Sequence, residues 1–183
     1  MQAATHTLDA LSVGREEAFE AAWRAHRHEV YRWALRFTGR PALAEDLTHD
    51  VFVKLLERIG HLERAGELGG WLYRVTANLA LSQLRRERSL VRKLGRILTG
   101  EDETSDGPDQ GLELREAAQN ALRTFRALPP RESLVLTMKV MDGKSQREIA
   151  DALGMSEGYV SKLIARAWQQ VRAAGWEVAY AGA

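Results

Sequence analysis

The sequence of 183 residues contains no cysteine, which excludes disulfide bonds, thiolate chemistry and cysteine-based zinc sites. It has only four prolines, and no alternating run of β-branched and polar residues indicates a strand. No apolar stretch is long enough to cross a bilayer, and the first residues lack the basic and apolar segments of a signal peptide. These absences predict a cytoplasmic protein that does not insert into membranes.

The abundant residues favour helices. Alanine, leucine, arginine and glutamate are all common, and each is a strong helix former. Hydrophobic residues make up 45% of the chain, enough for packed cores, and charged residues make up 28%. The sequence therefore predicts an all-α fold, and its length suits one ordinary domain or two small ones.

The formal net charge is only +1, but the charges are distributed unevenly. Residues 85–96 carry six bases and one acid, a local charge of +5. Residues 101–109 carry five acids and no base, and residues 123–172 carry nine bases and five acids. Two basic blocks that flank an acidic spacer favour a protein that binds nucleic acid.

The clearest domain boundary is the segment TGEDETSDGPDQG, residues 99–111, which has no apolar side chain. Such a segment cannot bury surface, so it predicts a flexible acidic linker that would span roughly 40 Å when extended. We therefore expect two small helical domains, at residues 10–98 and 112–176.

We expect three helices in the first domain, because apolar residues recur there at helical spacing. They cover residues 16–37, 42–59 and 71–88. In the second helix Leu47, Val51 and Leu55 stand at strict i, i+4 positions. A loop with four glycines, residues 60–70, precedes the third helix. Helices of this length can pack into one small bundle.

The second domain is expected to begin with a helix over residues 112–127. The pair Pro129-Pro130 suits the first turn of the next helix, and Gly143 suits its end. The apolar residues expected to be buried on that helix are Leu134, Val135, Met138 and Met141.

Residues 145–171 have the pattern of a helix-turn-helix. Ser145 and Glu148 form a capping box at the first helix, Gly154 permits a tight turn, and Ser156 can cap the second helix. The expected inward side chains are Ile149, Ala150 and Leu153, then Val160, Leu163, Ile164, Ala167 and Val171.

The second helix of such a motif lies in the major groove, with its N-terminal residues at the base edges. Lys162 and Arg166 suit phosphates or guanine edges. The candidates for contact with duplex DNA are Arg147, Ser156, Glu157, Tyr159, Ser161, Lys162 and Arg166. The alternative is a helical hairpin in a bundle that touches no DNA. For Tyr159 alone, the other interpretation is that it simply packs on the turn.

The second domain, with its pattern LPPRE…G.S..EIA..LG.SEG.V…RA, resembles region 4 of bacterial sigma factors, and it is also similar to the LuxR-type effector domain. In the first domain AEDLTHDVFVKLLE, residues 44–57, resembles the polymerase-binding helix of sigma region 2. WLYRVTANLALSQLRRERS, residues 71–89, resembles the helix that reads the promoter −10 element. Residues 15–174 as a whole resemble the extracytoplasmic-function (ECF) sigma factors of the sigma-70 family.

The resemblance implies an initiation subunit that binds core RNA polymerase through the β′ coiled coil and the β flap, recognises the −35 element with its second domain and melts the −10 element with its first. The residues matching the polymerase contact are Asp46, His49, Asp50 and Phe52. The family usually has Gln where His49 stands, which leaves open a weaker or pH-sensitive contact. A separate anti-sigma factor is the implied regulator.

The residues matching the −10 contact are Arg74, Asn78, Arg85, Arg86 and Arg88. Ser82 stands where the family often has Asp, and the loop over residues 60–70 does not resemble a common version. Trp71 and Tyr73 have two interpretations, stacking on bases or packing in the core, and the core is favoured for Trp71.

Two other functional classes are alternatives to an initiation subunit of RNA polymerase. A self-sufficient LuxR-type transcription regulator would need a receiver or ligand-binding domain, and the first 98 residues show no alternating βα pattern for one. A helical enzyme would need a reactive site, and no phosphate loop, nucleophile–base pair or metal spacing occurs. The histidines are His6, His26, His28, His49 and His61. The sequence therefore predicts no enzyme activity, no cofactor and no bound metal.

Overall fold

The computed structural model describes residues 2–58, 68–95 and 127–174. Their regular elements are all helices, as the composition predicts: α1 (Gln2–Thr38), α2 (Pro41–Arg58), α3 (Leu68–Gly95), α5 (Pro130–Val140), α6 (Gln146–Leu153) and α7 (Glu157–Ala173). Contacts divide the chain into two compact units, residues 1–82 and 83–183. The predicted linker, residues 99–111, and residues 112–126 of the predicted helix that follows lie outside the described residues, so the domain limits stay a prediction. Within the described ranges, no helix combines the length and apolarity needed to cross a membrane.

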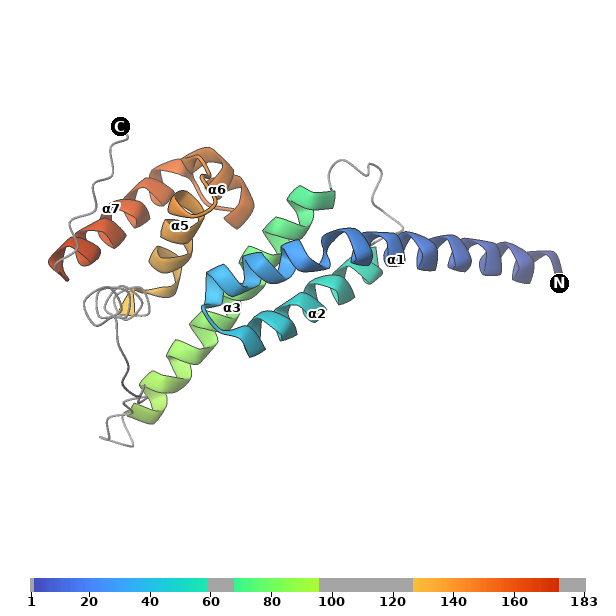
Figure 1. Cartoon of the computed structure of the whole chain (residues 1–183), viewed down its shortest axis with the longest axis horizontal. Helices are drawn as coiled ribbons and strands as arrows, with labels where there is room; N and C mark the ends of the chain where they lie inside the picture. Colours follow the sequence, from blue (N-terminus) through green and yellow to red (C-terminus); the bar gives the residue numbers. More distant parts are fainter. Residues whose placement is uncertain (1, 59–67, 96–126, 175–183) are drawn as a thin grey trace, which may run out of the picture. The chain divides into compact units, whose positions relative to one another are not determined.

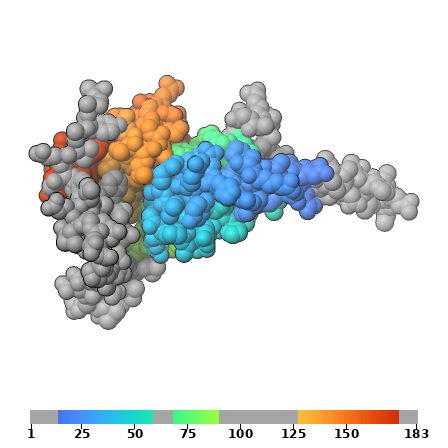
Figure 2. All heavy atoms as spheres, in the orientation of Figure 1, coloured from blue at the N-terminus to red at the C-terminus, as the bar shows by residue number. Residues whose placement is uncertain are grey.

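In the first unit α1 and α2 lie side by side as an antiparallel pair (Figure 1). Gly39 ends α1 with a φ of +66°, a conformation that favours glycine, and its N–H donates to the Leu35 carbonyl at 2.7 Å. Pro41 starts α2 two residues later, since proline suits a helix's first turn. The atoms of α1 and α2 form one continuous surface in Figure 2.

The core of the first unit is both aliphatic and aromatic. One cluster of its buried residues consists of Ala22, Val30, Val51, Phe52, Leu55 and Leu72. The Tyr73 ring packs edge-on against Trp33, with ring centroids 5.1 Å apart, and against Phe37 at 5.7 Å. Trp71 is half-buried and packs against the core cluster, so the structure places both Trp71 and Tyr73 in the core.

Two helices of this unit begin earlier than their sequence patterns predict. Helix α1 starts at Gln2 instead of residue 16, and the added segment has no proline and a single glycine, Gly14. Helix α3 starts at Leu68, so the last three residues of the expected loop are helical. Leu68 packs against the core cluster, which offsets the low helix propensity of the two glycines that follow.

In the second unit α5 begins at Pro130, as predicted, and ends at Val140. Leu134, Val135 and Met138 are fully buried, and so is Leu136, which the sequence pattern missed. The prediction for Met141 is wrong, because this side chain is 60% exposed. Met141 is the C-cap residue of α5, one position beyond the last residue of the helix.

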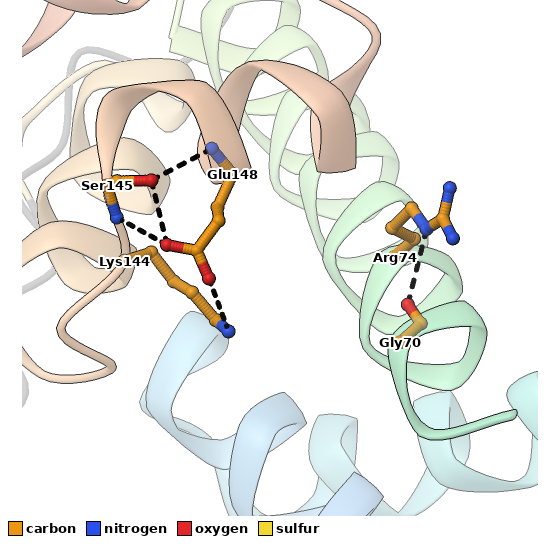
Figure 3. A network of polar contacts seen from close by, with 5 residues as sticks. All are labelled: Gly70, Arg74, Lys144, Ser145 and Glu148. Carbon is orange, nitrogen blue, oxygen red and sulfur yellow. Dashed lines mark hydrogen bonds and ion pairs between the residues drawn. The ribbon is translucent and has the colours of Figure 1, made fainter. Parts of the chain in front are cut away.

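The helix-turn-helix forms from α6 and α7 as its capping residues predict. The Ser145 N–H donates to Glu148 Oε2 at 2.8 Å, and the Glu148 N–H donates to Ser145 Oγ at 3.2 Å (Figure 3). Gly154 has a φ of +63°, and the Met155 N–H reaches the Ala150 carbonyl at 2.9 Å to close the turn. All the apolar residues that the sequence places inward on α6 and α7 are buried.

The capping box makes the stability of this unit depend on pH. Hydrogen bonds from the Ser145 backbone and side chain, with Lys144 nearby, lower the pKa of Glu148 from 4.5 to about 2. Because the folded pKa lies below the unfolded one, the ionised carboxylate stabilises the fold above about pH 4.5 and loses that contribution as the pH falls toward 2.

We predict that Glu148→Gln lowers the unfolding temperature near neutral pH, and that its difference from wild type disappears at low pH. Thermal unfolding across this pH range measures the difference. Asp151→Asn, on the same helix, is the control that removes an exposed carboxylate with no capping role. A difference that stays constant down to about pH 2 would contradict the capping role of the carboxylate.

Candidate functional site

The outward face of α2 is the first candidate surface. Asp46, His49 and Asp50 are exposed there, as the sequence predicts. Val53 is 57% exposed and Leu56 is 48% exposed, and helical spacing places both on the same face. These two residues were not predicted from the sequence, although they lie outside the Leu47–Val51–Leu55 stripe and could have been identified on that basis as exposed. The face therefore combines acidic side chains with exposed apolar side chains.

His49 lies at the edge of this face, where α2 meets α1. Its ring is tilted by 41° against that of Trp23, with centroids 5.9 Å apart. Its Nδ1 lies 3.3 Å from the Glu45 carbonyl, one helical turn earlier. These contacts give the imidazole a defined position beside Asp46 and Asp50.

Phe52 does not belong to the exposed set, which corrects the sequence-based assignment. Its side chain is 2% exposed, and its ring packs edge-on against Trp23, with centroids 4.7 Å apart, and against Phe19 at 6.2 Å. Phe52 follows Val51 and precedes Leu55 by three residues, so it lies on the buried side of α2. A partner that docks on the outward face meets the three polar residues and not this ring.

The second candidate surface is the polar side of α3. Arg74 and Asn78 are exposed one turn apart in the first unit. The Arg74 Nε donates to the Gly70 carbonyl at 3.3 Å (Figure 3), and the Asn78 Nδ2 donates to the Arg74 carbonyl at 2.8 Å. Because these bonds stay within α3, they orient the two side chains along the helix surface.

Three further arginines of the predicted set belong to the second unit. Arg85 and Arg86 are exposed near the end of α3. Arg88 is also exposed, and its Nη1 donates to the Leu128 carbonyl at 3.0 Å. One nitrogen of the Arg88 guanidinium is therefore bonded within the protein, whereas the sequence predicts a contact between Arg88 and DNA.

The third candidate surface is the exposed face of the helix-turn-helix. Ser156 is the N-cap of α7, and its side chain accepts the Tyr159 N–H at 3.3 Å. The predicted residues that are exposed on this face are Arg147, Glu157, Ser161, Lys162 and Arg166, with Ser156 itself. Among the described residues, Lys162 has no ion-pair partner.

Tyr159 differs from the rest of this set because it is half-buried and bonded. Its hydroxyl accepts a hydrogen bond from Arg131 Nη1 at 3.1 Å, and the Arg131 guanidinium lies 5.9 Å from its ring centroid. That hydrogen bond, with a smaller contribution from the nearby Arg166, lowers the pKa of Tyr159. Tyr159 therefore contacts Arg131 of α5.

Glu132, next to Arg131 on α5, was missed from the sequence. This residue is 5% exposed, and its carboxylate contacts two side chains of α7: it forms an ion pair with Arg166 Nε at 3.3 Å and accepts a hydrogen bond from Gln170 Nε2 at 2.9 Å. Its negative charge is buried but paired, which is the condition under which such burial is tolerated. No local pattern reveals the contact, because its partners are more than thirty residues away in the sequence.

The three candidate surfaces are suited to binding. Within the described ranges, no group of three acidic or histidine side chains could hold a metal ion. The surfaces on α3 and α7 are rich in arginine and lysine, which suits phosphate groups, whereas the α2 face is acidic and apolar, which suits a protein partner.

Comparison with known proteins gives two family matches. The model described as Sigma-70 region 2 matches residues 22–90, and the model described as Sigma-70, region 4 matches residues 118–171. The two matches follow each other along the chain without overlap, and they include all three candidate surfaces.

Several curated relatives are described as RNA polymerase sigma factors. The chain is 30% identical over 150 residues to the ECF RNA polymerase sigma factor SigE of Mycolicibacterium smegmatis, covering 81% of this chain and 58% of the relative. It is 29% identical over 167 residues to BldN of Streptomyces coelicolor, covering 87% and 61%, and 28% identical over 159 residues to CarQ of Myxococcus xanthus, covering 87% and 90%. The chain thus spans about three fifths of the length of SigE and BldN.

Among solved structures, the chain resembles the sigma factor RpoE of Bartonella quintana, which was crystallised in complex with the anti-sigma factor NepR. The TM-score is 0.58 at 18% identity, with 85% of this chain and 95% of that chain covered. At this level of identity the likeness shows the fold.

The core position of Phe52 leads to a prediction about stability. We expect Phe52→Ala to lower the free energy of unfolding by about 3–5 kcal/mol, because it leaves a cavity between α1 and α2. Val53→Ala, one residue on and exposed, should cost less than about 0.5 kcal/mol. Urea unfolding of the full chain measures both, and equal losses for the two variants would argue against the assigned rotation of α2.

Proposed function

The chain belongs to the sigma-70 family as an ECF member, and we propose that it is an RNA polymerase sigma factor that directs promoter recognition, −10 melting and transcription initiation. The observation that carries this proposal is the pair of region matches in one chain, each of which includes an exposed surface of suitable chemistry. Polymerase would supply the catalysis, so the chain itself is not an enzyme.

In the first unit the outward face of α2 would bind the β′ coiled coil of core polymerase. Asp46, His49 and Asp50 would supply polar contacts. The exposed side chains of Val53 and Leu56 would supply apolar surface that is buried away from water on docking. In the first unit about half of each of these two residues stays exposed to solvent. Their exposure beside two carboxylates supports a protein interface on this face.

The polar side of α3 would hold the −10 element while its strands separate. Arg74 and Asn78 would approach the DNA from the first unit. Arg85, Arg86 and Arg88 would add positive charge after them. Arginines bind phosphates by displacing counterions, and a base taken out of the stack can be held in a protein pocket.

The second unit would bind the −35 element as duplex DNA and meet the β flap of polymerase. Helix α7 would enter the major groove with Glu157, Ser161 and Lys162 near the base edges. Ser156 fixes the start of α7 by accepting the Tyr159 N–H, and the N–H groups that remain at the helix start would favour a phosphate.

Regulation by a separate anti-sigma factor is part of the proposal. The RpoE structure that this fold resembles was solved in complex with an anti-sigma factor. Masking of the α2 or α7 surface by such a partner would silence this chain. The site of action would be the cytoplasm, where core polymerase and promoter DNA are found. The LuxR-type alternative has less support, because residues 22–90 match sigma region 2 instead of a receiver or ligand-binding domain.

For the polymerase contact, we predict that Asp50→Arg weakens binding of purified core RNA polymerase by about tenfold or more, because a reversed charge on a docking face is strongly unfavourable. Glu17→Arg is the matched control, since it reverses an exposed charge on α1 of the same unit. Thermal unfolding checks that both variants keep the fold. Normal co-purification of polymerase with Asp50→Arg would contradict the assignment of this face.

For the DNA contact, we predict that Lys162→Ala lowers start-site-specific transcription by the reconstituted holoenzyme by about tenfold on promoters that the wild type selects. Arg172→Ala is the matched control, because it removes an exposed positive charge from the last turn of α7. If Lys162→Ala and the control transcribe equally well, the exposed start of α7 does not read the promoter.

A further inference from the structure

Two residues in the first turn of α5 contact three side chains of α7. Arg131 donates to the Tyr159 hydroxyl at 3.1 Å, and the neighbouring Glu132 forms an ion pair with Arg166 Nε at 3.3 Å and accepts a hydrogen bond from Gln170 Nε2 at 2.9 Å. Arg166 and Gln170 stand one helical turn apart, so a single carboxylate holds both. These contacts fix how α7 is rotated against α5.

The contact with Arg166 connects a buried group to an exposed one. The Glu132 side chain is 7% exposed, whereas the Arg166 side chain is 52% exposed. The ion pair is made through Nε of Arg166, the guanidinium nitrogen closest to the stem of the side chain. A guanidinium has five N–H donors in a planar fork, so its outer nitrogens keep donors for another ligand.

We propose that Glu132 is a positioning residue for sequence recognition: it holds the Arg166 guanidinium in place before DNA arrives, so that its outer nitrogens meet base edges in the −35 element. The inference rests on the proposed function, since it requires α7 to lie in the major groove. Pre-ordering removes the rotamer freedom that a long arginine side chain would otherwise lose on binding.

The charge of Glu132 has a second consequence. It partly neutralises Arg166, which weakens attraction to phosphates of any sequence but leaves directed hydrogen bonds to a base available. Loss of the carboxylate charge should therefore reduce binding to the selected sequence without reducing binding to other DNA. A purely structural contribution of Glu132 would lower both affinities together.

The test uses holoenzyme reconstituted from the full chain and core RNA polymerase, with two duplex probes. One probe is the sequence that the wild-type holoenzyme enriches from a library randomised over the upstream promoter element, and the other is a scrambled duplex of the same composition. The variants are Glu132→Gln, Arg166→Ala, both together, and Gln170→Met. The last is the control, because it removes the other partner of the same carboxylate and leaves the Arg166 contact.

We expect Glu132→Gln to lower the ratio of selected to scrambled affinity about 5- to 10-fold, with binding to the scrambled duplex at least as tight as in wild type. In the Arg166→Ala background the same change should alter the ratio less than about twofold, since coupled positions are not additive. Gln170→Met should keep the wild-type ratio within about twofold.

The proposal is overturned by an unchanged ratio in Glu132→Gln or in Arg166→Ala, by equal losses on both probes, or by an effect that persists without Arg166. If thermal unfolding shows that Glu132→Gln does not fold, Glu132→Asp replaces it, because the shorter side chain keeps the negative charge but no longer reaches Arg166 Nε. The ratio should then fall by a similar factor. A wild-type holoenzyme that enriches no sequence would refute the proposed function, whereas selective wild type with an unaffected Glu132 variant would refute only this inference.

Discussion

Each short helix of this protein must bury one apolar stripe against a neighbour, and that burial decides which side chains remain for binding. On α2 the aromatic packing of Phe52 against Phe19 and Trp23 holds one side of the helix inward. Asp46, Asp50 and two exposed apolar residues are left outside as a consequence. On α7 the buried stripe from Val160 to Val171 has the same effect, and it leaves the lysine and arginine face free.

Hydrophobic burial sets the approximate orientation of each helix, and polar contacts then fix where the helices begin and how they are rotated. The capping box at Ser145 fixes where α6 begins, and the Gly154 turn fixes where α7 follows. Glu132 adds a long-range constraint, since a buried carboxylate has strong directional requirements that apolar packing lacks. The exposed face of α7 is thus supported by bonded side chains of α5, and under the proposed function these side chains contribute to recognition as well as the exposed residues.

The features that depend on local rules could be read from the sequence. The capping box, the turn glycine and the inward stripes of α6 and α7 follow from residue spacing alone, and the structure confirms them. Burial that depends on tertiary contacts was less predictable: Phe52 matched a contact position of the family but packs in the core, and Met141 kept helical spacing after the helix had ended. The partners of Glu132 lie on another helix, so no local pattern identifies them.

The central claim is that two chemically different surfaces on one chain act together in transcription initiation. The most direct measurement adds the purified chain to core RNA polymerase and maps the 5′ ends of run-off transcripts from a bacterial DNA library. The account predicts stable association with the core and discrete new start sites that share upstream sequence elements. Tight and specific duplex binding by the chain alone, with no association with polymerase and no new start sites, would contradict it.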